Sequence, residues 1–585
     1  MRTYLRQYNS FIIKIGLFIK HFIIINILFI SLAYPLSNTS EDNQTIIKVV
    51  ETKSQSHIMQ KAFEAELLVK NFKYKEAAKI YYDICMESDD SEVAKRATQL
   101  AGYANDYELM LKSSKRWLEI SKDEIAVRHV RISIFLALNK INEATKETLL
   151  AIKISKDKDK FALVYDTIKV FDDQSVKKIF DSVYKKYKDE YLANFYYVQI
   201  LLNNNEYEKT INIIKSIDRF EDFSKKESRW GIFLANAYYE IGKEDLAVKT
   251  LKEYLEFSPK NLNLNQYYVT ILTLQEKYIE AIKHYRFMSA NKLISFSDVE
   301  TSKKMALLNI EAKKFIDAKT FINSLKEKDI NSYYYISGLL NSRNNKDAIA
   351  EDFFNKVSVD NKNYIDSVKE VANIKVRKKD FLSLKKFFEF QSKKVNNNTS
   401  MHMRLILIET EIFFNAEKFD HAMKKINFGL EKYKNNGAFL YTRALVAEKV
   451  NRMDIVESDL MKLIQLEPEN AQALNALGYT WANNNIKLKE ANSYIDKALA
   501  MEPNDAAILD SKGWVLYKLG NYNESEKYLM RALKLNDDSE IVSHVIQLLV
   551  KVDKIKDAKN VYKKYIKLKP KDKILIELKK ILDEI

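Results

Sequence analysis

The chain has 585 residues, of which 46% are hydrophobic and 30% charged, and it carries a formal net charge of +15. Only 10 Gly and 5 Pro residues are present, too few for the many turns of a mostly β-sheet fold. The apolar content is sufficient to offset the conformational entropy lost on folding, which excludes intrinsic disorder. Composition therefore predicts an all-α fold.

Residue counts also exclude several kinds of chemical site. The closest glycines, Gly513 and Gly520, are too far apart for a GxGxxG or GxxxxGK[ST] phosphate-binding loop. The single cysteine, Cys85, allows neither an intramolecular disulfide nor a multi-thiolate zinc site, and its predicted helix favours a small buried hydrophobe over a reactive thiol. No HExxH motif or His pair at helical ligand spacing is present. The sequence therefore predicts neither a metal site nor a cofactor.

Residues 1–33 have the order of a secretory signal peptide. Basic residues precede an apolar run from Phe22 to Ile30, and Ser31 and Ala33 supply small side chains before a cut after Ala33. The run is short for a membrane span, although the apolar residues before it could extend it into an uncleaved signal anchor. No cysteine lies near the cut, so a lipoprotein anchor is not expected. We expect an exported protein of the periplasm or cell envelope, with inner-membrane anchoring by this segment as the alternative.

The remainder of the chain divides by composition. Residues 34–55 are polar and are expected to form a flexible lead-in to the folded part. The basic excess is spread as Lys over helices of mixed charge, so it is interpreted as a solvated surface and no nucleic-acid partner is expected. The run of Asn396, Asn397 and Asn398 is the best internal break, and it divides an N-terminal array over 56–395 from a C-terminal array over 396–585.

The C-terminal array contains a repeat with a period of about 34 residues. Pro468, Pro503 and Pro570 mark the period, because a helix must stop where a residue cannot donate a backbone hydrogen bond. Between them, small and large apolar residues recur at fixed positions. One repeat has Leu474, Leu477, Gly478, Ala491, Ile495 and Ala498, and the next has Leu509, Gly513, Leu516, Ser525, Leu529 and Ala532. These residues match the tetratricopeptide pattern, in which two antiparallel helices approach closely at the small positions.

The same spacing of small and large apolar residues occurs in the repeat that ends at Pro259. Between about 90 and 230, and again from 290 to 430, the spacing becomes irregular. Segments such as 144–152 and 318–325 still have an apolar helical face, so these stretches are interpreted as degenerate repeats. We predict an α-solenoid of about fourteen recognisable helix-turn-helix repeats, each buried only against its neighbours.

Two strings carry a closer resemblance, ALNALGYTWANNN from Ala473 and DSKGWVLYKLG from Asp510. Over residues 470–571 the chain resembles a family of exported proteobacterial tetratricopeptide proteins, whose best-known member is the lipoprotein adaptor of a periplasmic carboxyl-terminal processing protease. The resemblance implies a scaffold that presents protein substrates to that protease. The absence of a lipoprotein cysteine departs from that adaptor, and the N-terminal repeats cannot be matched residue by residue.

In each repeat, positions 2, 5, 9, 12 and 13 of the first helix are expected to line a concave groove. Aromatic and amide side chains at these positions suit peptide recognition. The predicted groove residues are Tyr441, Asn475, Tyr479, Asn483, Asp510, Trp514, Tyr517 and Lys518. The alternative is that Tyr479 and Trp514 only stabilise neighbouring repeats. Asp510 lies where a clamp for a terminal carboxylate would need a basic donor, which argues against a chaperone-tail receptor.

The sequence therefore predicts a non-enzymatic scaffold of the bacterial cell envelope that binds protein or peptide partners. A scaffold for polysaccharide export or outer-membrane assembly is the alternative, and an enzyme with an unrecognised site is a distant one, because the repeats leave no room for a separate catalytic domain.

Overall fold

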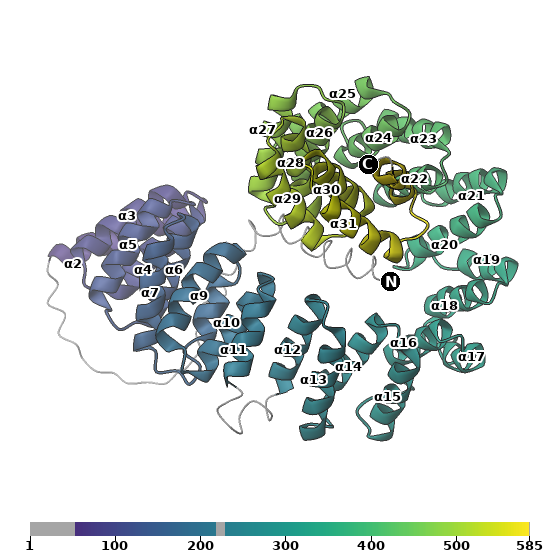
Figure 1. Cartoon of the computed structure of the whole chain (residues 1–585). Helices are drawn as coiled ribbons and strands as arrows, with labels where there is room; N and C mark the ends of the chain where they lie inside the picture. Colours follow the sequence, from purple (N-terminus) through teal and green to yellow (C-terminus); the bar gives the residue numbers. More distant parts are fainter. Residues whose placement is uncertain (1–52, 218–227, 584–585) are drawn as a thin grey trace. The chain divides into compact units, whose positions relative to one another are not determined.

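The computed structural model describes residues 53–217 and 228–583, and within these ranges it contains thirty-one α-helices and no strand (Figure 1). The predicted all-α class is confirmed. The expected signal segment, 1–33, lies outside the described residues, as does most of the expected lead-in. Residues 53–55 of that lead-in are already helical, because α2 begins at Lys53.

The described chain forms two compact units that divide between Lys314 and Phe315. The helices of the first unit are α2 (Lys53–Lys70), α3 (Tyr74–Glu87), α4 (Ser91–Tyr103), α5 (Tyr107–Ile120), α6 (Ile125–Ala137), α7 (Ile141–Ile154), α8 (Ala162–Ile168), α9 (Asp173–Tyr187), α10 (Tyr191–Asn203), α11 (Tyr207–Ile217), α12 (Ser228–Glu240), α13 (Glu244–Phe257), α14 (Leu262–Leu274), α15 (Tyr278–Ala290) and α16 (Val299–Glu311).

The helices of the second unit are α17 (Phe315–Asn323), α18 (Ile330–Arg343), α19 (Asp347–Asn355), α20 (Tyr364–Arg377), α21 (Phe381–Lys394), α22 (Thr399–Asn415), α23 (Phe419–Lys432), α24 (Gly437–Lys449), α25 (Met453–Leu466), α26 (Ala471–Asn483), α27 (Leu488–Met501), α28 (Ala506–Lys518), α29 (Tyr522–Leu535), α30 (Ser539–Lys551), α31 (Ile555–Leu568) and α32 (Lys573–Asp583).

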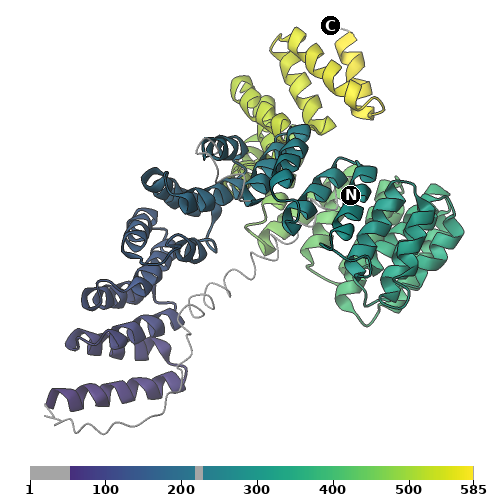
Figure 2. The ribbon, with the colours of Figure 1, turned by 90° about the horizontal axis from the view of Figure 1, so that it is seen from below.

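Within each unit, successive helices pack against one another in chain order, and Figure 2 shows the same stacking from below. From α2 to α31 the helices form fifteen helix-turn-helix pairs, close to the fourteen repeats expected, and α32 follows the last pair. Within each unit, contacts join the two helices of most pairs and each pair to the next, as in α26 with α28 and α28 with α30. This is the predicted α-solenoid of tetratricopeptide repeats.

The turn inside each pair explains how the repeat continues where its sequence pattern fades. Fourteen of the fifteen pairs place a residue at positive φ in this turn, the exception being α8 with α9. The residue is Gly at only two of these turns, Gly242 and Gly520, and is often Asn, which tolerates the left-handed conformation better than most residues. The repeat therefore persists through 90–230 and 290–430 with few glycines.

The predicted helix stops and close approaches are also confirmed. Pro259, Pro468, Pro503 and Pro570 each lie two residues beyond the second helix of a pair. A Cβ added at Gly513 would lie 2.5 Å from Leu529 Cγ, so this position has no room for a side chain.

The Asn run at 396–398 lies inside the second unit, in the turn between α21 and α22. Asn398 caps α22 by accepting a hydrogen bond from the Met401 amide at 3.0 Å, and the neighbouring Val395 is buried. These asparagines begin a helix of the array, and the division between the two compact units lies earlier, at Lys314. None of the described helices is both long and apolar enough to cross a membrane.

Candidate functional site

A cavity of about 230 Å³ opens on the first helices of the last complete repeats. These helices are α24, α26, α28 and α30, the last three of which follow one another in Figure 1. Apolar residues such as Ala444, Val456 and Leu460 line part of the cavity. Its polar and aromatic lining consists of Tyr441, Glu448, Asn475, Tyr479, Thr480, Asp510, Ser511 and Glu540.

Four of the eight predicted groove residues therefore line one cavity: Tyr441, Asn475, Tyr479 and Asp510. The other four lie elsewhere. Asn483 is exposed at the end of α26, and Trp514, Tyr517 and Lys518 form a stack of their own. The structure thus divides the predicted groove into a cavity and a separate aromatic cluster.

Tyr479 connects repeats across the cavity. It projects from α26 and its hydroxyl donates a hydrogen bond to the Glu540 carboxylate on α30, two repeats further along. Burial, together with the nearby carboxylates of Glu540 and Asp510, raises the pKa of the Tyr479 phenol, which remains a neutral hydrogen-bond donor. One rim of the cavity is held in place by this bond.

Asp510 is tied to the next repeat by His544. The two carboxylate oxygens of Asp510 lie 3.0 and 2.9 Å from His544 Nδ1, and both side chains are buried, at 5% and 4% exposure. Burial raises the pKa of the Asp510 carboxyl, and the hydrogen bond from His544 opposes only part of that shift. Asp510 thus serves the packing of α28 on α30 as well as the cavity wall.

Trp514 is not on the open groove surface that its repeat position predicts. It is only 4% exposed, its ring is stacked 4.0 Å from that of His544, and the Tyr517 ring lies 4.9 Å away on a nearly parallel plane. The ammonium of Lys518 lies 4.7 Å from the indole centre. Trp514 therefore contributes to the contact between α28 and α30.

The difference between Tyr479 and Trp514, which share repeat position 9, comes from the following helix. At position 6 of the next repeat, Trp514 meets the large ring of His544, whereas the equivalent residue after Tyr479 is the small Ser511. Because Ser511 leaves space, Tyr479 remains partly exposed and the cavity opens beside it.

Asn475 has an amide with no hydrogen-bond partner among the described residues. Its Oδ1 atom is shielded from solvent and unpaired, although the side chain lines the cavity. An unsatisfied buried polar atom costs about 1–3 kcal/mol, and a rotation of this amide toward the cavity would allow Oδ1 to accept a hydrogen bond from a bound group.

The cavity also contains two further carboxylates: Glu448, which lies at an expected groove position, and Glu540, which the sequence pattern did not indicate. Glu448 occupies position 12 of its repeat, and Glu540 occupies position 2 of the repeat that begins at Ser539. Extending the same position count by one repeat would have found Glu540. The repeat that contains Glu540 is harder to recognise, because the repeat before it ends at Asp537 and not at a proline.

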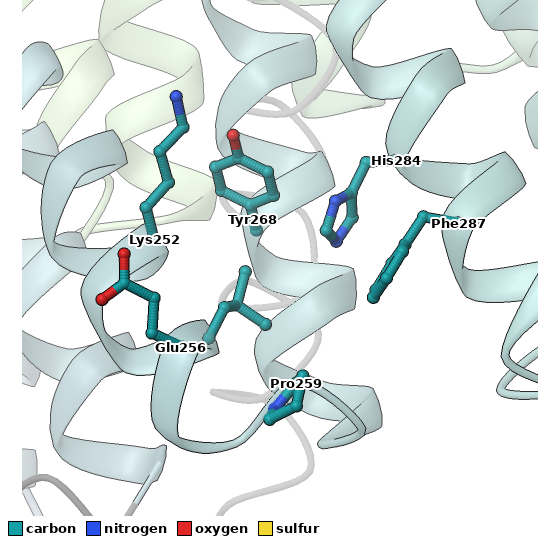
Figure 3. Close-up of a pocket in the computed structure, with 7 residues that line it drawn as sticks. Lys252, Glu256, Pro259, Tyr268, His284 and Phe287 are labelled. Atoms are coloured by element: carbon teal, nitrogen blue, oxygen red, sulfur yellow. The ribbon is translucent and has the colours of Figure 1, made fainter.

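A second cavity, of about 370 Å³, lies in the first unit between α13, α14 and α15 (Figure 3). Tyr268, His284 and Phe287 stand on one side of it and Lys252 and Glu256 on the other. None of the predicted groove residues lies here.

His284 is held as a neutral ring at this second cavity. The Asn265 amide nitrogen donates to two backbone carbonyls, so its Oδ1 accepts the hydrogen on His284 Nε2 at 2.7 Å. Burial lowers the pKa of His284 to about 4. His284 is thereby fixed as part of the packing of α14 on α15.

Groups for metal or thiol chemistry do not assemble in the part of the chain that the structure describes. No three His, Cys, Asp or Glu residues there are placed to hold a metal ion. Cys85 is buried in α3, and burial raises the pKa of its thiol to about 11, so the expected small buried hydrophobe is confirmed.

Comparison with known proteins agrees with the repeat architecture. Residues 506–539, which include α28 and α29, match the tetratricopeptide repeat family. A TPR repeat-containing protein of Pseudomonas aeruginosa is 42% identical over 143 residues, which are 24% of this chain and 24% of the relative. A TPR repeat-containing protein of Methanocaldococcus jannaschii is 25% identical over 383 residues, 60% of this chain and 65% of the relative. The chain therefore spans about a quarter of the first relative and just under two thirds of the second.

Two solved structures are also similar. A thermophilic TPR protein of Thermus thermophilus aligns over 31% of this chain and 100% of its own, with 20% identity and a TM-score of 0.30. Yeast Tom70 aligns over 90% of this chain and 95% of its own, with 14% identity and a TM-score of 0.33.

Proposed function

We propose that this protein is a non-enzymatic scaffold that binds an extended segment of a protein partner in the cavity between α24 and α30. The observation that carries the proposal is the unpaired Oδ1 atom of Asn475 in a cavity that the half-buried rings of Tyr441 and Tyr479 also line. A side-chain amide offers one acceptor and two donors, which match the N–H and C=O groups of an extended peptide backbone.

The dimensions and the aromatic lining support the same occupant. A cavity of about 230 Å³ is smaller than the roughly 300–1,000 Å³ of sites for drug-sized ligands, and it suits one side chain of a longer chain. Tyrosine rings provide large contact areas at low entropic cost, which is why they are frequent at binding hot spots.

The test compares binding with stability in the full chain. Asn475→Ala combined with Tyr479→Ala should weaken partner capture by about 2 kcal/mol or more, the size of a hot-spot loss, while helical content remains that of the parent. Lys534→Ala, an exposed change on the second helix α29, is the matched control. Partners would be cross-linked in the native envelope, purified and quantified. Undiminished capture by the folded double variant would remove this cavity from the binding surface.

We further propose that the scaffold works in the cell envelope, where it presents protein substrates to a periplasmic carboxyl-terminal processing protease. Two features support this: the order of residues 1–33 and the resemblance over residues 470–571 to adaptors of such proteases. The Pseudomonas protein that is 42% identical over 143 residues is also a TPR repeat-containing protein.

Two measurements test the setting and the partner. Amino-terminal sequencing of the envelope protein should find Tyr34, within a few residues, as the first residue. An intact Met1 in the membrane fraction would instead support the signal anchor. Addition of the purified scaffold should accelerate degradation of a co-purified envelope protein by the protease, and an unchanged rate would contradict the adaptor role.

A further inference from the structure

We propose that the cavity between α24 and α30 selects a basic side chain, Arg in preference to Lys, from the bound segment of the partner. This inference rests on the proposed function and adds the chemical class that the cavity recognises.

Two carboxylates line the cavity, and neither forms an ion pair with a cation of the described residues. Glu448 on α24 is half-buried and forms no ion pair among the described residues, and the Glu540 carboxylate on α30 accepts only the Tyr479 hydroxyl. Burial raises the pKa of Glu448, and repulsion from Glu540 adds to that effect. Glu540 is exposed, so a cation bound near both carboxylates would offset the partial burial of the Glu448 charge and the repulsion between the two.

The other charged groups near the cavity do not supply that cation. His544 is engaged by Asp510, and the Lys518 ammonium lies over the Trp514 ring. Lys449 is exposed beside Glu448 and offsets only part of its pKa shift. Asp505 and Asp538, which cap α28 and α30 through hydrogen bonds to backbone amides, add further negative charge close by.

The remaining lining favours a guanidinium. The Tyr441 and Tyr479 rings offer faces on which a planar cation can stack, and carboxylates accept the paired N–H groups of Arg in a bidentate arrangement. The unpaired Oδ1 of Asn475 adds an acceptor that is independent of the carboxylates. The carboxylates and the Asn475 Oδ1 atom accept hydrogen bonds, and the ring faces attract positive charge. Arg matches them because it carries five N–H donors and no acceptor.

Overall electrostatics would produce the opposite preference. The chain has a net charge of +15, so non-specific association favours acidic peptides. Enrichment of basic peptides would therefore be evidence for a local acidic site, because the net charge of the chain cannot produce it.

The experiment presents the full chain with a library of immobilised 15-residue peptides of random composition. Peptides retained by the parent should be enriched in Arg and, less strongly, in Lys. A selected Arg peptide should bind about tenfold or more weakly to Glu448→Gln combined with Glu540→Gln, because charge-assisted hydrogen bonds lose their ionised acceptor. Glu490→Gln on the outer helix α27, an exposed carboxylate, should bind like the parent.

A second variant keeps the test decisive if the double change alters folding. Glu448→Lys places a cation in the cavity, so it should reject Arg peptides and retain those with Asp or Glu. Retained peptides without basic enrichment, or Arg peptides that bind equally to the folded Gln variants, would overturn this inference and leave the peptide groove standing. No retained peptide at all would overturn both proposals.

Discussion

Gly513 lies where α28 and α29, the two helices of its repeat, come close together, so this single residue determines how the two helices pack. A Cβ there would lie 2.5 Å from Leu529 Cγ and 3.1 Å from the Leu529 backbone nitrogen. We predict that Gly513→Ala destabilises the protein by about 1–3 kcal/mol, because overpacking outweighs the roughly 1 kcal/mol that Ala normally gains over Gly in a helix. Urea unfolding measured by circular dichroism would show the loss.

Gly102 on α4 provides the matched control. The nearest atom to a Cβ at Gly102 is the flexible tip of Met110, at 3.3 Å. Gly102→Ala should therefore be neutral or stabilising. An equal gain from both substitutions would show that α28 and α29 do not meet closely at Gly513.

Small positions such as Gly513 could be predicted from the sequence because their repeat partners, Gly478 among them, recur at a fixed interval. The fate of Trp514 could not be predicted in the same way. Its exposure depends on His544, a residue of the following repeat, and the repeat pattern does not constrain the size of that residue. Whether a side chain on the first helix of a repeat lies in the groove or in the core thus depends on the size of the residues that it meets in the following repeat.

At the scale of helices, the contact between α6 and α8 in the first unit contains a buried histidine whose protonation makes stability depend on pH. The Thr167 hydroxyl on α8 donates its hydrogen to the Leu163 carbonyl, so its oxygen accepts a hydrogen bond from His129 Nδ1 on α6 at 2.8 Å. Burial lowers the pKa of His129 to about 4, with only partial opposition from Asp157. The ring is therefore neutral in the folded protein well below the ordinary His pKa of about 6.5.

We predict that this contact loses stability on acidification. Between about pH 6.5 and pH 4 the unfolded chain binds a proton at His129 that the folded chain does not, so the free energy of unfolding falls by up to about 3 kcal/mol as the pH decreases. His129→Gln should reduce the acid sensitivity of urea unfolding measured at pH 7, 5.5 and 4.5. Replacement of the exposed His57 serves as control, and identical acid sensitivity in parent and His129→Gln would contradict the assignment.

At the level of helices, the sequence predicted more in the second unit than in the first. Pro468, Pro503 and Pro570 mark the ends of repeats in the second unit, whereas Pro259 is the only proline within the described residues of the first unit. The left-handed Asn, Lys or Glu inside most pairs of both units gives no equally specific signal. Likewise, Asn398 could be interpreted as a linker or as a helix cap, and only its hydrogen bond to Met401 decides between them.

Over the whole molecule, stability is expected to be local, because helices contact mainly the pairs beside them. The last described helix, α32, buries Leu575, Leu578 and Leu582 against α30 and α31. Ser539 on α30 also donates to Asp572, just before α32, at 2.6 Å. Removal of residues 573–585 would eliminate the burial of these three leucines, worth roughly 4.5–9 kcal/mol at about 1.5–3 kcal/mol each.

We predict that this truncation loosens the array progressively from its cut end. Amide hydrogen exchange should accelerate strongly in α30 and α31, less in α28 and α29, and not in α24 and α25. Ile574→Ala with Ile576→Ala, on the exposed face of α32, should leave exchange unchanged. Because Glu540 lies on α30 and Asn475 on α26, the truncated chain should lose preference for Arg peptides before it loses peptide binding. Uniform acceleration from α24 to α31 would instead show that these repeats unfold as one cooperative body.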